Sequence, residues 1–125
     1  MLLKSAVSLA ICACWLSAPL PAAASQTARR LCGWIENPTP ANWWITDARG
    51  QWIINTQGGR QADGDTPTFK ANQWVKTQPN GYGYGCGCID AVVDVKDTAV
   101  VKIKKARALP LATCRRDKAL KEPSE

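Results

Sequence analysis

The sequence predicts a small all-β protein, with an antiparallel sheet rolled into a barrel or sandwich and stapled by disulfides. Several short segments rich in aromatic and β-branched residues alternate with turn signals, which is typical of strands. No repeat, heptad or long helical period interrupts them. An apolar N-terminal segment precedes four cysteines, and this combination indicates an exported chain in which cysteines pair.

The N-terminal segment has the pattern of a signal peptide. Lys4 is followed by an apolar run from Ala6 to Leu16, and this run is shorter than the roughly 20 residues of a membrane-spanning helix. Pro19 and Pro21 end the run, and Ala22-Ala23-Ala24 supplies the small residues that a signal peptidase reads. We expect a signal peptide at 1–24, cleaved after Ala24, although a retained anchor is an alternative. Residues 25–125 then form a single small β domain with a short C-terminal tail and no membrane span.

Four cysteines remain after cleavage: Cys32, Cys86, Cys88 and Cys114. Two residues two apart in a strand lie about 6.5 Å from each other, near the upper limit for a disulfide. We therefore expect Cys86 and Cys88 to reach separately to Cys32 and Cys114, with the pairing left open. A redox dithiol or a zinc site would be the alternatives, but Cys-x-x-Cys spacing is absent. The prediction is structural disulfides, with no metal and no cofactor.

The first half of the mature chain contains a short apolar segment and a hairpin. Leu31–Ile35 is followed by the loop Glu36–Asn42, where two prolines oppose regular structure. Trp43–Thr46 and Gln51–Thr56 are strand-like, and Asp47-Ala48-Arg49-Gly50 between them has the residues of a tight turn. The polar, glycine-rich stretch Gln57–Pro67 is predicted as a long loop, which is often functional or mobile.

The second half begins with a strand candidate at Gln73–Lys76 and a turn at Pro79–Gly81. In Tyr82–Cys88 every second residue is glycine, so one strand face is bare and could receive a tryptophan of the protein or a ligand. The apolar residues then change phase, which predicts a bulge near 87–89. After a turn at Lys96–Thr98, Ala99–Arg107 returns as a hairpin partner, and Arg115–Lys121 is expected to make one helical turn.

Several of these motifs resemble a family of exported bacterial proteins known as domain of unknown function 4087. The resemblance covers about Leu31 to Leu120 and implies an envelope location but no particular activity. It rests on the order of Cys32-Gly33-Trp34, Asn37-Pro38-Thr39-Pro40, Thr46-Asp47, Gly50, Trp52, Gln57-Gly58-Gly59, Trp74-Val75-Lys76, Tyr82-Gly83-Tyr84-Gly85-Cys86-Gly87-Cys88 and Cys114.

Aromatic residues are the candidates for ligand binding. Adjacent Trp43 and Trp44 must point to opposite faces of a strand, so one of the pair should be partly exposed. Tryptophans also fill small cores, which is the alternative for each of them. Asp63 and Asp65 are interpreted as residues of a solvated turn. The candidate ligand-binding set is Trp43, Trp44, Trp52, Trp74, Tyr82 and Tyr84.

Basic residues crowd the C-terminal quarter of a chain whose formal net charge is +6. In a regular strand Lys102 and Lys104 share one face, and Lys105 and Arg107 share the other. A basic stripe would attract an anionic polymer or a lipid head group. The alternative is an edge strand that lysines protect from pairing with other chains.

We expect a periplasmic or secreted, monomeric binding module for an envelope glycan or another anionic polymer. The alternative is a protein-directed inhibitor or accessory factor that uses Asn37–Asn42 or Gln57–Pro67 as a plug. Nucleic acid is not an expected partner, because we expect the chain to be exported. The sequence has no histidine, which removes the usual histidine-dependent nucleophile systems, so we expect no enzyme and assign no catalytic residue.

Overall fold

The computed structural model describes residues 10–18 and 26–124. Residues 10–18 contain no helix or strand, and the cleavage site proposed after Ala24 lies outside the described residues. Within the described part, no helix has the length and apolar character needed to cross a bilayer. The regular elements are β1 (Gln26–Asn37), β2 (Trp43–Asp47), β3 (Gly50–Asn55), η1 (Ala71–Gln73), β4 (Trp74–Lys76), η2 (Pro79–Gly81), β5 (Gly83–Asp94), β6 (Ala99–Leu109) and α1 (Leu111–Arg115).

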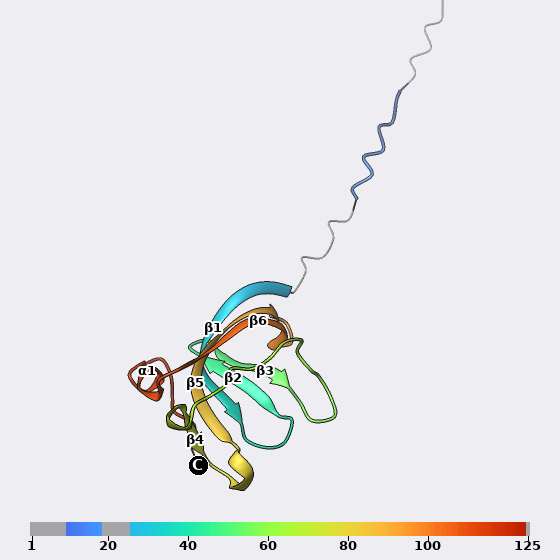
Figure 1. Cartoon of the computed structure of the whole chain (residues 1–125). Helices are drawn as coiled ribbons and strands as arrows, with labels where there is room; N and C mark the ends of the chain where they lie inside the picture. Colours follow the sequence, from blue (N-terminus) through green and yellow to red (C-terminus); the bar gives the residue numbers. More distant parts are fainter. Residues whose placement is uncertain (1–9, 19–25, 125) are drawn as a thin grey trace, which may run out of the picture.

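The strands form one sheet in the order β1-β2-β3-β6-β5-β4, and an additional β1–β5 pairing closes five of them into a ring. Figure 1 shows the long strands β1, β5 and β6 curving round the short β2–β3 hairpin. The pairings are antiparallel except for β3 and β6, which meet in parallel at Ile53 and Ala99. Because β5 returns beside β1, the ring is a five-stranded Greek-key barrel, the architecture to which the OB-fold belongs. The predicted all-β, rolled sheet is confirmed.

The barrel interior is filled by alternate residues of the strands. β1 and β5 pair along twelve residues, from Gln26 opposite Asp94 to Asn37 opposite Gly83. The predicted hairpin is confirmed, with Asp47 paired to Gly50 across a two-residue turn. The interior core consists of Leu31, Ile35, Ile45, Trp52, Ile54, Ile89, Ala91, Val93, Val100 and Ile103.

The bulge predicted at residues 87–89 is wrong. β5 stays in register with β1 through this stretch, and the register shifts against β6 lie later, at Asp90/Ala91 and Val92/Val93. Gly83, Gly85 and Gly87 therefore share a face with Ile89, whereas the tyrosine and the cysteines lie on the outer face. The apolar residues change phase because β5 contributes to two cores. Tyr84 and Cys86 pack on its outer face, and Ile89, Ala91 and Val93 pack on its inner face, so the strand itself stays regular.

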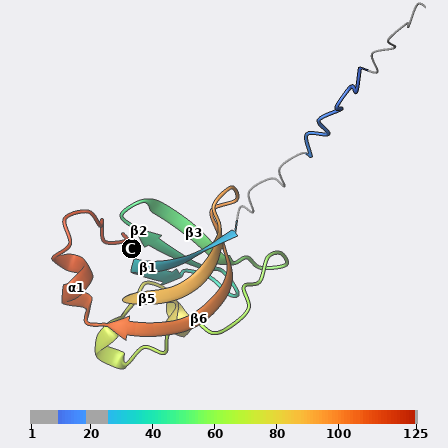
Figure 2. The ribbon, with the colours of Figure 1, turned by 90° about the horizontal axis from the view of Figure 1, so that it is seen from above.

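The second core lies outside the barrel and is covered by the C-terminal segment. It contains Trp34, Tyr84, Cys86 and Cys114, all buried, with leucines from β6, α1 and the tail against them. Figure 2 shows α1 beside the end of β6. The predicted helical turn at 115–121 is wrong, since the helix ends at Arg115. Beyond it, Glu122 accepts hydrogen bonds from the Tyr84 hydroxyl and from Arg115, which holds the tail in place.

Two disulfides staple this arrangement, as predicted. Cys32 pairs with Cys88, and Cys86 pairs with Cys114. The first joins directly opposed residues of β1 and β5, and the second joins β5 to α1. The N-terminal strand and the C-terminal helix are thus both bound to β5.

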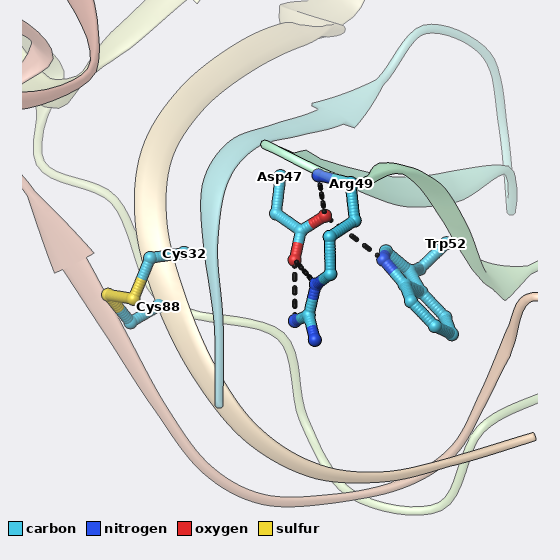
Figure 3. A network of polar contacts seen from close by, with 5 residues as sticks. All are labelled: Cys32, Asp47, Arg49, Trp52 and Cys88. Carbon is cyan, nitrogen blue, oxygen red and sulfur yellow. Dashed lines mark hydrogen bonds and ion pairs between the residues drawn. A yellow bond between two sulfur atoms is a disulfide. The ribbon is translucent and has the colours of Figure 1, made fainter. Parts of the chain in front are cut away.

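At the β2–β3 turn, Asp47 forms a buried polar network (Figure 3). Its carboxylate accepts hydrogen bonds from the Arg49 backbone N–H, the Arg49 guanidinium and Trp52 Nε1. The guanidinium carbons of Arg29 and Arg49 lie 5.5 and 5.8 Å from the centre of the Trp52 ring. Trp52 therefore closes the barrel core beneath charged side chains.

Candidate functional site

A groove lined by aromatic side chains lies where β4 joins the sheet. Its volume is about 610 Å³, within the range of small-molecule sites. Trp74 is at the centre, with the Phe69 ring 4.9 Å away and the Trp43 ring 6.1 Å away, centre to centre. The lining is completed by Asn37, Pro67, Lys70, Ala71, Lys76 and Gly81.

The hairpin and the preceding loop place Trp43. Trp43 is the first residue of β2 and packs against the interior core, so its ring stands at the border between core and groove. The Asn37 side chain donates hydrogen bonds to the carbonyls of Thr39 and Asn42, at 2.9 and 2.7 Å. These bonds fix the proline-containing loop that leads into the strand. The loop thus orients the tryptophan and does not extend freely.

The bare glycine face of β5 receives Phe69. A Cβ added at Gly85 would lie 2.6 Å from the Phe69 ring and 2.6 Å from the Gln73 carbonyl oxygen, closer than real contacts permit. At Gly83 the neighbour is backbone, because an added Cβ would lie 1.8 Å from the Val75 carbonyl oxygen. The glycines therefore let a ring and a strand of the protein approach β5. The ring is Phe69, where a tryptophan was expected.

Trp74 is held by its strand and by a hydrogen bond. It pairs with Gly85 in the β4–β5 ladder, and its Nε1 donates to the Gly81 carbonyl at 2.8 Å. Trp43, Phe69 and Trp74 are each half-buried, so part of every ring remains accessible. Three fixed and partly exposed aromatic rings make an apolar surface that a flat apolar ligand face can contact.

The charge around the groove is positive. Lys70 and Lys76 line it and are exposed. Among the described residues, no carboxylate lines the groove. The site therefore suits a ligand that combines an apolar face with a negatively charged group, because the lysines attract the charge while the rings contact the face.

The other predicted aromatic residues lie elsewhere. Trp44 points to the opposite side from Trp43, and its Nε1 donates to Glu36 at 2.6 Å. The pKa of Glu36 is raised by burial, which outweighs this hydrogen bond. Trp52 is 5% exposed and Tyr84 is 4% exposed, so both serve the cores. Tyr82 is half-buried before β5 and does not line the groove.

The Tyr84 hydroxyl keeps its proton even in alkaline solution. Burial and the hydrogen bond to Glu122 raise the pKa of its hydroxyl to about 12. The ring packs edge-on against Trp34, with ring centres 5.3 Å apart. The side chain therefore acts as a hydrogen-bond donor in the second core and fastens the C-terminal tail.

Three of the four basic residues of β6 lie on the outer face, which differs from the expected arrangement. Lys104 has no partner in the β5–β6 register, because a shift occurs between Asp90 and Ala91. This irregularity brings Lys102, Lys105 and Arg107 to the outer face. They lie opposite Val92, Asp90 and Cys88 of β5.

The glycine-rich segment at 57–67 is tied to the barrel at several points. Thr56 N–H donates to the Arg60 carbonyl, and Ala62 N–H donates to Ile54 and to the Asn55 side chain. Asp63 pairs with β6 at Lys102. In the described part of the chain, no three His, Cys, Asp or Glu side chains gather as a metal site would require.

Sequence reasoning missed Phe69, Lys70 and Lys76 as groove residues. Phe69 is the one phenylalanine of the chain and stands in a segment without strand pattern. A signal was present in the glycines of β5, which indicated that some ring had to come close. The pattern did not identify the ring, because Phe69 and Gly85 are far apart in the sequence and come into contact only in the folded protein.

Comparison with family models gives a match to "Protein of unknown function (DUF4087)" over residues 25–121. The chain belongs to the DUF4087 family. The match includes the whole barrel, the groove and all four paired cysteines, so the DUF4087 region is the folded part described above. No curated protein and no solved structure matches the chain.

Proposed function

We propose that this DUF4087 protein is a non-catalytic binding module that holds an acidic glycan of the cell envelope in the aromatic groove. The observation that carries the proposal is the convergence of Trp43, Phe69 and Trp74 beside two lysines. Aromatic faces contact the apolar side of a sugar ring, and lysines attract its acidic group. Five-stranded Greek-key barrels are also used for oligosaccharide binding, which is an analogy of fold only.

We propose further that the protein acts outside the cytoplasm, in the periplasm or after secretion. Two disulfides are typical of proteins in an oxidising, extracytoplasmic environment. The N-terminal segment supports export through its apolar run, and the family match begins at residue 25, directly after the expected cleavage site. An acidic envelope glycan would be accessible in that compartment.

The proposal is tested by binding measurements on the mature protein. The probes are soluble peptidoglycan fragments, which carry carboxylates, and chitin oligosaccharides, which are neutral sugars of similar shape. We expect the acidic fragments to bind and the neutral ones to bind more weakly, with the difference falling as salt rises. Isothermal titration calorimetry measures both. Absence of binding to the acidic fragments would contradict the proposal.

Variants locate the binding site. Trp74→Ala should weaken binding by about tenfold, equivalent to about 1.4 kcal/mol, because it removes the central ring. Trp44→Ala is the matched control, since this neighbour of Trp43 lies on the other side of β2 and should leave binding unchanged. Lys70→Gln with Lys76→Gln should reduce the salt dependence. Equal losses in Trp44→Ala and Trp74→Ala would place the ligand outside the groove.

A further inference from the structure

The Cys32–Cys88 disulfide lies in the open outer face of the barrel, away from the groove. Cys32 is exposed, and Cys88 lines a cavity of about 410 Å³ on the same face. The two residues are directly opposed in the β1–β5 ladder. Cys88 is 9% exposed, so a dissolved thiol would approach this disulfide from the side of the exposed Cys32.

The surroundings of this disulfide are basic. The cavity is lined by Arg30, Lys105 and Arg107, with Asp90 as the one carboxylate among its described lining residues. Arg30 pairs with Asp90 at 2.8 Å, while Arg107 stands directly opposite Cys88 in the β5–β6 register. Positive charges near a cysteine stabilise its thiolate, which makes it a better leaving group in thiol–disulfide exchange.

The Cys86–Cys114 disulfide has the opposite environment. Cys86 is fully buried and Cys114 is 3% exposed, and both lie in the second core. An attacking thiolate would have to enter an apolar cluster, and the neighbouring cation Arg115 is already paired with Glu122, so it neutralises a departing thiolate less effectively. Access and leaving-group stability thus favour the same disulfide, Cys32–Cys88.

We propose that Cys32–Cys88 is a thiol-exchange site, which a dithiol reductant opens while Cys86–Cys114 stays closed. One thiolate of the dithiol attacks Sγ of Cys32, the Cys32–Cys88 bond breaks, and Cys88 leaves as a thiolate beside Arg107. The second thiolate of the dithiol then attacks its own mixed-disulfide sulfur and releases Cys32. The protein gains two electrons and two protons, and the dithiol becomes a disulfide.

After reduction, the fold keeps Cys32 and Cys88 in position to form their disulfide again. The ladder between β1 and β5 extends on both sides of the cysteines, over twelve residue pairs. Removal of one covalent bond leaves these hydrogen-bonded strands in place, so the two thiols remain opposite each other. An oxidant of the disulfide class can then restore the bond by the reverse exchange.

The experiment uses the oxidised mature protein and dithiothreitol as the dithiol. Samples are quenched with a light alkylating agent, fully reduced, labelled with a heavy one, and mapped by peptide mass spectrometry. Cys32 and Cys88 should acquire the light label at least about tenfold faster than the other pair, at a rate proportional to dithiothreitol concentration. Equal rates for the two disulfides, or earlier opening of Cys86–Cys114, would overturn the proposal.

Charge variants test the role of the basic face. Lys105→Gln with Arg107→Gln should slow the opening of Cys32–Cys88 several-fold, because the leaving thiolate loses its counter-charges. Lys118→Gln with Lys121→Gln makes the same change in net charge at the C-terminal tail and should leave the rate unchanged. Circular dichroism checks that both variants retain the fold. Identical opening rates in the two double variants would refute the assigned role of Lys105 and Arg107.

Discussion

Asp47 illustrates how a single buried carboxylate can be stable in a small barrel. Burial by itself raises the pKa of a carboxyl group, because the charged form loses water. Here the hydrogen bonds from Arg49 and Trp52 outweigh burial, and the pKa of Asp47 is lowered. The same bonds fix the turn between β2 and β3 and hold Trp52 in the core. A residue that looked like a simple turn former thus joins the hairpin to the interior.

Asp47→Asn should lower the free energy of unfolding by about 1–3 kcal/mol at neutral pH, because the amide cannot accept all of the bonds and faces the guanidinium. The stability that the charged Asp47 contributes is complete above the pKa of an unfolded aspartate, about 4. It is lost as pH falls through the lower folded pKa. Urea unfolding at pH 7 and in acid measures both effects, and the difference between wild type and variant should shrink in acid.

Asp97→Asn is the matched control for this prediction. Asp97 pairs with Arg60 at 3.2 Å, but both side chains are exposed, and such pairs contribute little. The control should change stability by less than about 0.5 kcal/mol. Equal losses in the two variants, or a loss for Asp47→Asn that does not depend on pH, would contradict the assigned role of the buried carboxylate.

The six aromatic residues selected from the sequence illustrate a limit of local patterns. Trp43 and Trp74 line the groove, whereas Trp52 and Tyr84 fill the two cores. Each stands in a similar strand-like context, so alternation indicates that a side chain points to one face but not what covers that face. Burial depends on the partner element, and the partners of these strands come from distant parts of the chain.

The strand β5 had the most informative pattern and led to one wrong expectation. Its alternating glycines correctly indicated a close approach by other parts of the chain. The change of apolar phase at Cys88/Ile89 was attributed to a bulge, because a sheet with one buried face allows no other solution. In fact the outer face of β5 is also covered at Tyr84 and Cys86, by α1 and the tail, so a regular strand can be apolar first on one side and then on the other.

Gly85→Ala tests the contact that shapes the groove. The new methyl group would meet the Phe69 ring and the Gln73 carbonyl, and overpacking of this kind costs about 1–3 kcal/mol. We expect a lower unfolding midpoint in urea and a changed tryptophan fluorescence spectrum, since Phe69 packs against Trp74.

Gly59→Ala is the corresponding control. Its added Cβ would approach the Thr56 hydroxyl, the end of a side chain that can rotate away. We expect a small change in stability and an unchanged fluorescence spectrum. If Gly85→Ala behaved in the same way as the control, Phe69 would not be seated on β5 as described.

The whole molecule is organised around β5, which contributes one cysteine to each of the two disulfides. Cys32–Cys88 spans 56 residues of sequence and Cys86–Cys114 spans 28. Each loop closure restricts the unfolded chain, and the effect grows only slowly with loop length. The second disulfide also retains the C-terminal segment, which packs against Trp34, Tyr84 and Cys86 of the barrel.

Replacement of Cys86 and Cys114 by alanine should lower the free energy of unfolding by roughly 3–4 kcal/mol, from the loop length and the loss of packing. The C-terminal segment should also become sensitive to proteases, because β5 no longer holds α1. Urea unfolding and limited trypsin digestion, read by mass spectrometry, measure the two effects. A variant that loses stability but keeps a protected C-terminal segment would show that the tail contacts suffice without the disulfide.

The sequence by itself determined the class of fold, the β2–β3 hairpin, the β5–β6 hairpin and the set of paired cysteines. These features depend on neighbouring residues: turn residues between two strands, alternation within a strand, and an even cysteine count after the expected signal peptide. The tertiary structure alone decided the pairing of the cysteines, the second core, the basic outer face of β6 and the groove. Each of these arises where segments far apart in the chain meet, and local patterns contain no information about which distant surface will cover them.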